Sequence, residues 1–97
     1  MSKSYFLSIY REVRDPAKVA AYARLAGPAI EAAGGRFIVR GQPVQVHEAG
    51  LRERTVVIEF PDLQKAVAMY ESPAYREALA QLGDGAERDI RIVEGTE

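Results

Sequence analysis

Cysteine is absent from this 97-residue sequence, and histidine occurs once, at His47. Without thiols the chain cannot form a disulfide scaffold, a thiolate nucleophile, or a zinc or iron–sulfur site built on cysteine ligands. A single histidine excludes a multi-histidine metal centre within one chain. The acidic residues Glu48, Glu53 and Asp62 show no metal-ligand spacing. We therefore predict a protein with no metal and no cofactor.

An excess of either charge is also missing. Thirteen basic and 14 acidic side chains give a net charge of −1. Proteins that bind nucleic acid by neutralising phosphates are usually clearly basic, so we expect no nucleic-acid partner. No run approaches the roughly 18 apolar residues of a membrane span, and the N-terminus has no signal-type apolar region. We expect no membrane partner and a cytoplasmic location.

The length and composition are those of one globular domain. A domain usually takes roughly 100–200 residues, so we expect residues 1–97 to form a single unit. Hydrophobic residues make up 47% and charged residues 28% of the chain, which is normal for a soluble domain. Surface scaling indicates that about 64% of the unfolded surface becomes buried, which supports a modest core.

Capping residues and prolines predict where the helices begin. The signals are Asp15-Pro16, Pro61-Asp62 and Ser72-Pro73. They predict helices over residues 17–33, 63–71 and 73–82. Pro28 lacks an amide proton, so a kink or break is expected there. Gly34-Gly35 ends the first helix, and one of these glycines should adopt the left-handed conformation.

Runs of β-branched and aromatic residues predict strands over residues 5–13, 36–40, 55–60 and 88–94. Extended structure is expected to resume over residues 44–48, at a sheet edge, because Pro43 cannot donate a ladder hydrogen bond. The resulting order is β-α-β-β-α-β. This order predicts an α+β, ferredoxin-like fold, with a four-stranded antiparallel sheet and its helices on one face.

Three motifs occur in order along the chain, followed by a closing Val93-Glu94-Gly95. They are Gly34-Gly35-Arg36-Phe37-Ile38-Val39-Arg40-Gly41, Val57-Ile58-Glu59-Phe60-Pro61 and Tyr70-Glu71-Ser72-Pro73-Ala74-Tyr75. From Tyr5 to Gly95 the chain thus resembles the DUF1330 family. It departs over Leu79–Gly85, which lacks the arginines often found there, so no role for such an arginine carries over. The resemblance implies a ferredoxin-like dimeric α/β-barrel and implies no reaction, because the family's function is unknown.

Strand periodicity sorts the two faces of the predicted sheet. The more apolar sets should lie under the helices: Leu7/Ile9, Phe37/Val39, Val56/Ile58/Phe60 and Ile90/Ile92. The opposite face would then carry Phe6/Ser8/Tyr10, Arg36/Ile38/Arg40, Thr55/Val57/Glu59 and Asp89/Arg91/Val93. No further element remains to cover that face, although its centre is apolar. We therefore expect a homodimer in which a second copy buries it.

Four residues of this uncovered face are the leading candidates for a ligand site: Tyr10, Arg36, Arg40 and Glu59. Two guanidinium groups could hold a carboxylate, with Glu59 acting as an acid or base. Alternatively, the arginines and Glu59 form structural ion pairs between adjacent strands. Both interpretations fit the sequence.

Three residues are weaker candidates. His47 titrates near neutral pH, but its neighbour Glu48 would point to the opposite face of a strand, so an exposed edge histidine is the alternative. Tyr22 and Tyr70 could contact a ligand, or their rings could fill the core. None of the three has a sequence neighbour that identifies a catalytic arrangement.

Two functions remain open. The first is a small protein that binds an acidic or aromatic metabolite between its sheet and a dimer partner. The alternative is a cofactor-independent enzyme, monooxygenase-like or isomerase-like, because other proteins of the dimeric α/β-barrel type act on small aromatic, lactone or polyketide-like substrates without a metal or flavin. That alternative rests on analogy of fold.

Overall fold

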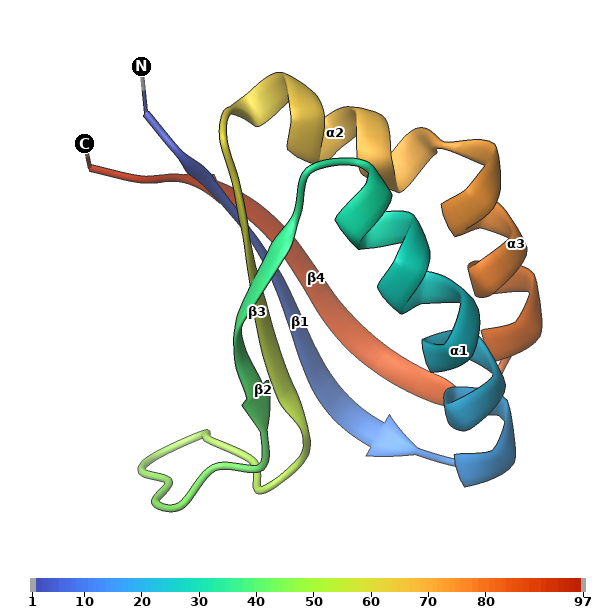
Figure 1. Cartoon of the computed structure of the whole chain (residues 1–97). Helices are drawn as coiled ribbons and strands as arrows, with labels where there is room; N and C mark the ends of the chain where they lie inside the picture. Colours follow the sequence, from blue (N-terminus) through green and yellow to red (C-terminus); the bar gives the residue numbers. More distant parts are fainter. Residues whose placement is uncertain (1, 97) are drawn as a thin grey trace.

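The computed structural model describes residues 2–96, which form one sheet and three helices (Figure 1). The elements are β1 (Ser4–Val13), α1 (Pro16–Ala32), β2 (Arg36–Gly41), β3 (Thr55–Phe60), α2 (Leu63–Glu71), α3 (Pro73–Leu82) and β4 (Ala86–Glu94). The predicted bounds of β3, α2 and α3 are confirmed. The other elements differ from the prediction by one or two residues at an end.

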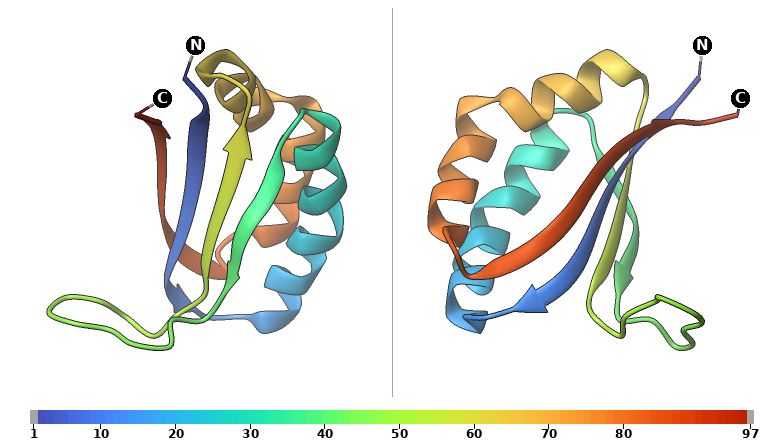
Figure 2. Two further views of the ribbon diagram at one scale, coloured as in Figure 1. Left: turned by 60° about the vertical axis from the view of Figure 1, so that its left-hand side comes forward. Right: turned by 180° about the vertical axis from the view of Figure 1, so that it is seen from behind.

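The sheet is antiparallel and has the strand order β2-β3-β1-β4. All three helices cover the same face, and the opposite face has no covering element among residues 2–96 (Figure 2). This arrangement confirms the α+β, ferredoxin-like fold. The sheet of the single chain is open.

The helix termini follow the capping signals. The Asp62 carboxylate accepts a hydrogen bond from the Lys65 amide at 2.8 Å, and Ser72 Oγ accepts one from the Tyr75 amide at 3.2 Å. Gly34 has φ +98°, as expected for a glycine that ends a helix. The predicted break at Pro28 is wrong, because α1 continues through it. Ala26 and Ile30 are buried on either side of Pro28, so packing holds the helix together.

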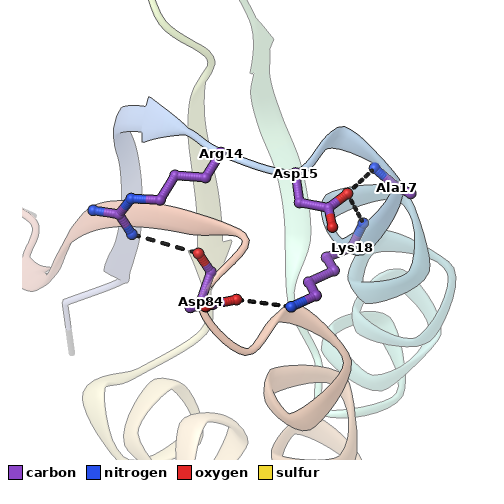
Figure 3. Close-up of polar contacts among 5 residues, drawn as sticks. All are labelled: Arg14, Asp15, Ala17, Lys18 and Asp84. Carbon is purple, nitrogen blue, oxygen red and sulfur yellow. Dashed lines mark hydrogen bonds and ion pairs between the residues drawn. The ribbon is translucent and has the colours of Figure 1, made fainter.

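The junction between β1 and α1 is fixed against the turn between α3 and β4 (Figure 3). Asp15 caps α1 by accepting hydrogen bonds from the amides of Ala17 and Lys18. Lys18 Nζ then reaches Asp84 Oδ1 at 2.7 Å, and Arg14 donates to the Asp84 carbonyl at 3.4 Å. The start of α1 is thereby held at one end of the sheet.

The predicted face of β1 is wrong. Phe6, Ser8 and Tyr10 are buried beneath the helices, at 0%, 3% and 3% exposure. Phe6 lies opposite Ile58 of β3, which is also buried. Leu7 and Ile9 therefore lie on the uncovered side of the sheet. The sequence misleads because both faces of β1 are apolar and because the buried face contains Ser8.

A β-bulge reverses the predicted faces in the second half of β2. Phe37 pairs with Ile58 and Val39 pairs with Val57, so one extra residue, Ile38, is inserted between them. Val39 consequently lies on the uncovered side with Val57, where it is 47% exposed. Arg40 pairs with the buried Val56 and so turns toward the helices. Strict alternation had placed both residues on the opposite sides.

The segment after β2 is a loop, not the predicted strand at residues 44–48. It projects from the sheet on the side away from the helices (Figure 2). Val44 is 97% exposed, so its apolar side chain has no packing partner that would stabilise a strand here. A turn forms instead, in which the Gly50 amide donates to the His47 carbonyl at 2.8 Å.

Candidate functional site

A pocket of about 260 Å³ lies between α1 and the covered face of β1, β2 and β3. The face of α1 that borders it carries small residues, including Ala20, Ala23 and Gly27. A Cβ atom added at Gly27 would find no atom within 4 Å. The sequence thus leaves space under α1 where larger side chains would have filled a core.

The pocket has an apolar end and a positively charged end. Phe6, Ile30 and Ile58 form the apolar part. At the other end lie Tyr10, Arg40 and Arg54, and the Tyr10 amide donates to the Arg54 carbonyl at 3.0 Å. None of the described residues that line the pocket is acidic. A small molecule with an apolar body and a negative group would match both ends.

A third arginine stands behind the charged end. Arg88 of β4 pairs with Tyr10 in the sheet register. Its Nη1 donates to the Tyr22 hydroxyl at 3.0 Å and to Ser8 Oγ at 3.3 Å. The guanidinium carbon lies 4.7 Å from the centre of the Tyr22 ring and 5.7 Å from that of Tyr10, which are cation–π distances. Tyr22 also shares a 2.6 Å hydrogen bond with the Tyr75 hydroxyl.

Burial and the nearby charge set the protonation of this cluster. Burial raises the pKa of Tyr75, and the adjacent Tyr22 adds to the effect. Burial also raises the pKa of Tyr10, against the opposing influence of Arg88. Burial disfavours the charged form of Arg88, but Tyr22 and Tyr75 outweigh it and raise the pKa of the guanidinium. Arg88 is therefore charged, and Tyr10 and Tyr75 are neutral, at neutral pH.

The four leading candidates do not share one face. Tyr10 and Arg40 line the pocket beneath α1. Arg36 and Glu59 pair across β2 and β3 on the uncovered side, with Arg36 Nη2 3.1 Å from Glu59 Oε1. The hydrogen bond from Arg36 lowers the pKa of Glu59, and Lys3 contributes from 3.5 Å. This geometry matches the alternative of a structural ion pair for Arg36 and Glu59.

The three weaker candidates lie in different parts of the structure. Tyr22 lines the pocket. Tyr70 packs in an aromatic cluster, with its ring centre 5.9 Å from that of Phe6 and 5.4 Å from that of Tyr75. His47 lies in the exposed loop, where Nε2 is 2.8 Å from Gln45 Nε2. Neither Tyr70 nor His47 lines the pocket.

Sequence reasoning missed Ser8, Arg54 and Arg88 as members of the site. A signal for Arg88 was present, because it precedes Ile90 and Ile92 by two and four residues and so shares their face in a regular strand. An arginine on the covered face of a sheet is unusual unless it has partners there. Arg54 lies just before β3, where strand alternation gives no guidance.

Metal sites and membrane-spanning helices are absent from the part of the chain that the structure describes. Among residues 2–96, no group of three or more histidine, cysteine, aspartate or glutamate side chains is placed to hold a metal ion. Within the same part of the chain, each helix is too short or too polar to cross a membrane.

Residues 3–96 match the model of one protein family, described as a domain of unknown function, DUF1330. No curated protein is significantly similar to the chain. The family match covers nearly the whole sequence, including every element of the fold.

Solved structures with a similar fold include proteins of known and unknown function. A protein of unknown function from Rhodopseudomonas palustris is 22% identical, with a TM-score of 0.76 over 99% of this chain and 84% of that chain. A dimeric ferredoxin-like protein of unknown function from Thermobifida fusca is 17% identical, with a TM-score of 0.68 over 97% and 92%. SnoaB, a cofactor-independent oxygenase from Streptomyces nogalater, is 11% identical, with a TM-score of 0.68 over 100% and 96%. At these identities the likeness establishes the fold alone.

Proposed function

Because the chain belongs to the DUF1330 family, whose function is unknown, we propose a function from its pocket: the protein binds a small organic acid with an aromatic or aliphatic body. The observation that carries this proposal is the pairing of an apolar cavity with Arg40 and Arg54 and with no acidic lining residue among those described. Arg54 is half-buried, Arg40 is exposed, and neither forms an ion pair among the described residues, so both guanidinium groups are free to hold an anion.

The size of the pocket limits the ligand. Drug-sized ligands occupy pockets of roughly 300–1,000 Å³, and this one has about 260 Å³. A single ring bearing one acidic group is therefore an appropriate size. The ring would lie against Phe6 and Ile58, and the acidic group would lie toward Arg40 and Arg54. This places the ligand under α1, on the other side of the sheet from the location expected from the sequence.

The pocket favours binding over acid–base catalysis. Its described lining has no histidine, aspartate, glutamate, lysine or cysteine, and Tyr10 and Tyr22 are its ionisable groups besides the arginines. A general base working near neutral pH needs a pKa in that range, whereas burial raises the pKa of Tyr10. The enzyme alternative gains no support from these residues.

Arg40→Gln should weaken the binding of benzoate by tenfold or more. A hydrogen bond to a charged group contributes about 1.5–3 kcal/mol, and the glutamine keeps most of the side-chain volume but not the charge. Isothermal titration calorimetry measures the affinity, with neutral benzamide as the comparison ligand. The matched control is Arg24→Gln, on the exposed side of α1, which should bind benzoate as the wild type does. Equal affinity for benzoate and benzamide would contradict an anion site.

We also propose that two copies associate through the uncovered face of the sheet. Leu7, Ile9 and Val57 form its apolar centre, and Val39 and Val93 are 47% and 49% exposed there. A contiguous apolar surface of this kind is rarely left in water. The Thermobifida fusca protein of the same fold is dimeric, which supports the assignment. The two facing sheets would form the dimeric barrel.

Sedimentation equilibrium at micromolar concentration should give twice the 10.7 kDa mass of one chain. A stable interface buries on the order of 1,600 Å², which two sheet faces can supply. Val57→Glu places a charge at the centre of this face and should yield the single-chain mass. Ala74→Glu introduces the same charge on an exposed helix position and should remain dimeric. A wild-type protein that sediments as one chain would exclude the dimer.

A cytoplasmic location stays a prediction of this proposal. Fractionation of cells that express the protein tests this location.

A further inference from the structure

Two residues that line the pocket, Ser8 and Tyr22, carry hydroxyl groups that accept hydrogen bonds from the same arginine. Arg88 Nη1 donates to Tyr22 at 3.0 Å and to Ser8 at 3.3 Å. A hydroxyl group has one proton to donate and two acceptor positions. Both oxygens therefore already accept a hydrogen bond. The direction of each hydroxyl proton determines whether that hydroxyl can also donate to a ligand.

The positions of the two oxygens leave open which tyrosine donates, and the difference in burial between Tyr75 and Tyr22 favours one direction. Tyr75 is fully buried, and among residues 2–96 the Tyr22 oxygen, at 2.6 Å, is the acceptor that its proton reaches. Leaving a buried donor without a partner is costly. We take Tyr75 as the donor because it is fully buried, whereas Tyr22 borders the pocket and can donate to a molecule there. Tyr22 then accepts from both Arg88 and Tyr75, and its own proton remains available to a molecule in the pocket.

Among residues 2–96, the charged side chains that line the pocket or bond to Ser8 and Tyr22 are all positive. Arg88 approaches from β4, Arg54 from the start of β3 and Arg40 from β2, while Tyr10 and Tyr75 contribute neutral hydroxyls from β1 and α3. Arg88 forms no ion pair among the described residues, and the neighbouring Asp89 is bound to Arg91 at 2.8 Å. The protons of Ser8 and Tyr22 are thus polarised by a charge that no carboxylate offsets.

We propose that Ser8 and Tyr22, polarised by Arg88, form an oxyanion-binding subsite, and that this subsite holds a phenol-type ligand by its ionised oxygen. The inference rests on the proposed function, since it uses the same pocket, and it adds a second ligand class whose anionic oxygen lies at Ser8 and Tyr22 instead of at Arg40 and Arg54. A single oxygen suits the subsite better than a carboxylate, because each hydroxyl offers one proton and Arg88 is already engaged behind them. The aromatic ring then extends into the apolar end.

para-Nitrophenol tests the subsite, because its absorption band distinguishes the phenolate from the phenol. With protein in excess, the bound probe should titrate at least about one pH unit below the free probe, which corresponds to tenfold tighter binding of the phenolate. Tyr22→Phe keeps the ring and removes the donated proton, and it should reduce this shift by more than half. The matched control, Tyr70→Phe, removes a hydroxyl outside the pocket and should keep the full shift.

Arg88→Met supplies a second test, since it removes the charge and leaves Ser8 and Tyr22 in place. It should abolish the shift, and if it does not fold, the comparison of Tyr22→Phe with Tyr70→Phe still decides. A probe that binds with an unshifted titration, or a shift that survives Tyr22→Phe, overturns the subsite and leaves the proposed function standing. Failure of both benzoate and para-nitrophenol to bind the wild type overturns the proposed function itself.

Discussion

Replacing Phe60 by alanine should lower the free energy of unfolding by about 3–5 kcal/mol, from the lost burial and the cavity that remains. Phe60 is fully buried at the end of β3 and belongs to the core cluster with Ile58, Ile30 and Met69. Domains of this size have roughly 5–15 kcal/mol of stability in total. The variant should therefore be close to unfolding at room temperature.

Urea titration followed by circular dichroism measures this loss, at one protein concentration for all variants because dimer stability depends on concentration. Phe37→Ala is the comparison, because Phe37 lies on the same face but is only partly buried, beside the pocket. Its loss should be clearly smaller. A loss below about 1 kcal/mol for Phe60→Ala would be incompatible with a core position.

Gly35→Ala should destabilise the fold by about 1–3 kcal/mol through overpacking. An added Cβ would lie 2.6 Å from Ile30 Cγ2, 2.9 Å from Ile58 Cγ2 and 2.9 Å from Phe60 Cζ. These three side chains are buried, and the two isoleucines are stiff because of their branched Cβ atoms. The strand β2 would have to move away from the core to accommodate the methyl group.

Gly27→Ala, in contrast, should raise the free energy of unfolding by about 0.5–1 kcal/mol. Gly27 lies inside α1, and a Cβ there meets no atom within 4 Å. Thermal melts of the two glycine variants side by side provide the check. Equal effects would mean that backbone freedom, and not the space around each glycine, controls both positions.

The fold could be predicted from the sequence because its strongest signals agree with one another. Asp62 and Ser72 act as helix caps, and β3 alternates so clearly that Val56, Ile58 and Phe60 were placed in the core. The face of β1 could not be predicted, since apolar residues occupy both of its sides. In the structure Phe6 and Tyr10 are buried under the helices, and Ser8 shares their face with its oxygen bonded to Arg88, a residue 80 positions away.

The site was predicted only in its parts. Tyr10, Arg40 and Tyr22 were singled out, but the structure groups them with Arg54 and Arg88 and separates them from Arg36 and Glu59. Strict alternation assumes that no residue is inserted in the strand, so it predicts that Arg40 lies on the same face as Arg36. The space beside α1 could not be predicted either, because alanine is ordinary in a helix and an internal glycine does not show whether a neighbour or an open space lies against it.

The inserted residue in β2 has a consequence for altering this protein by design. Val39 lies on the uncovered side of the sheet, which we propose as the surface for a second copy, and Ile38 is exposed beside it, whereas the next residue, Arg40, lines the pocket on the other side. Association of two copies and ligand binding would therefore depend on neighbouring residues of one strand, and each residue can be varied separately. Libraries at residues 38 and 39 would vary the uncovered face, and libraries at residue 40 would vary the pocket. Because the three residues are consecutive in β2, double-mutant cycles would measure how far the two effects are coupled.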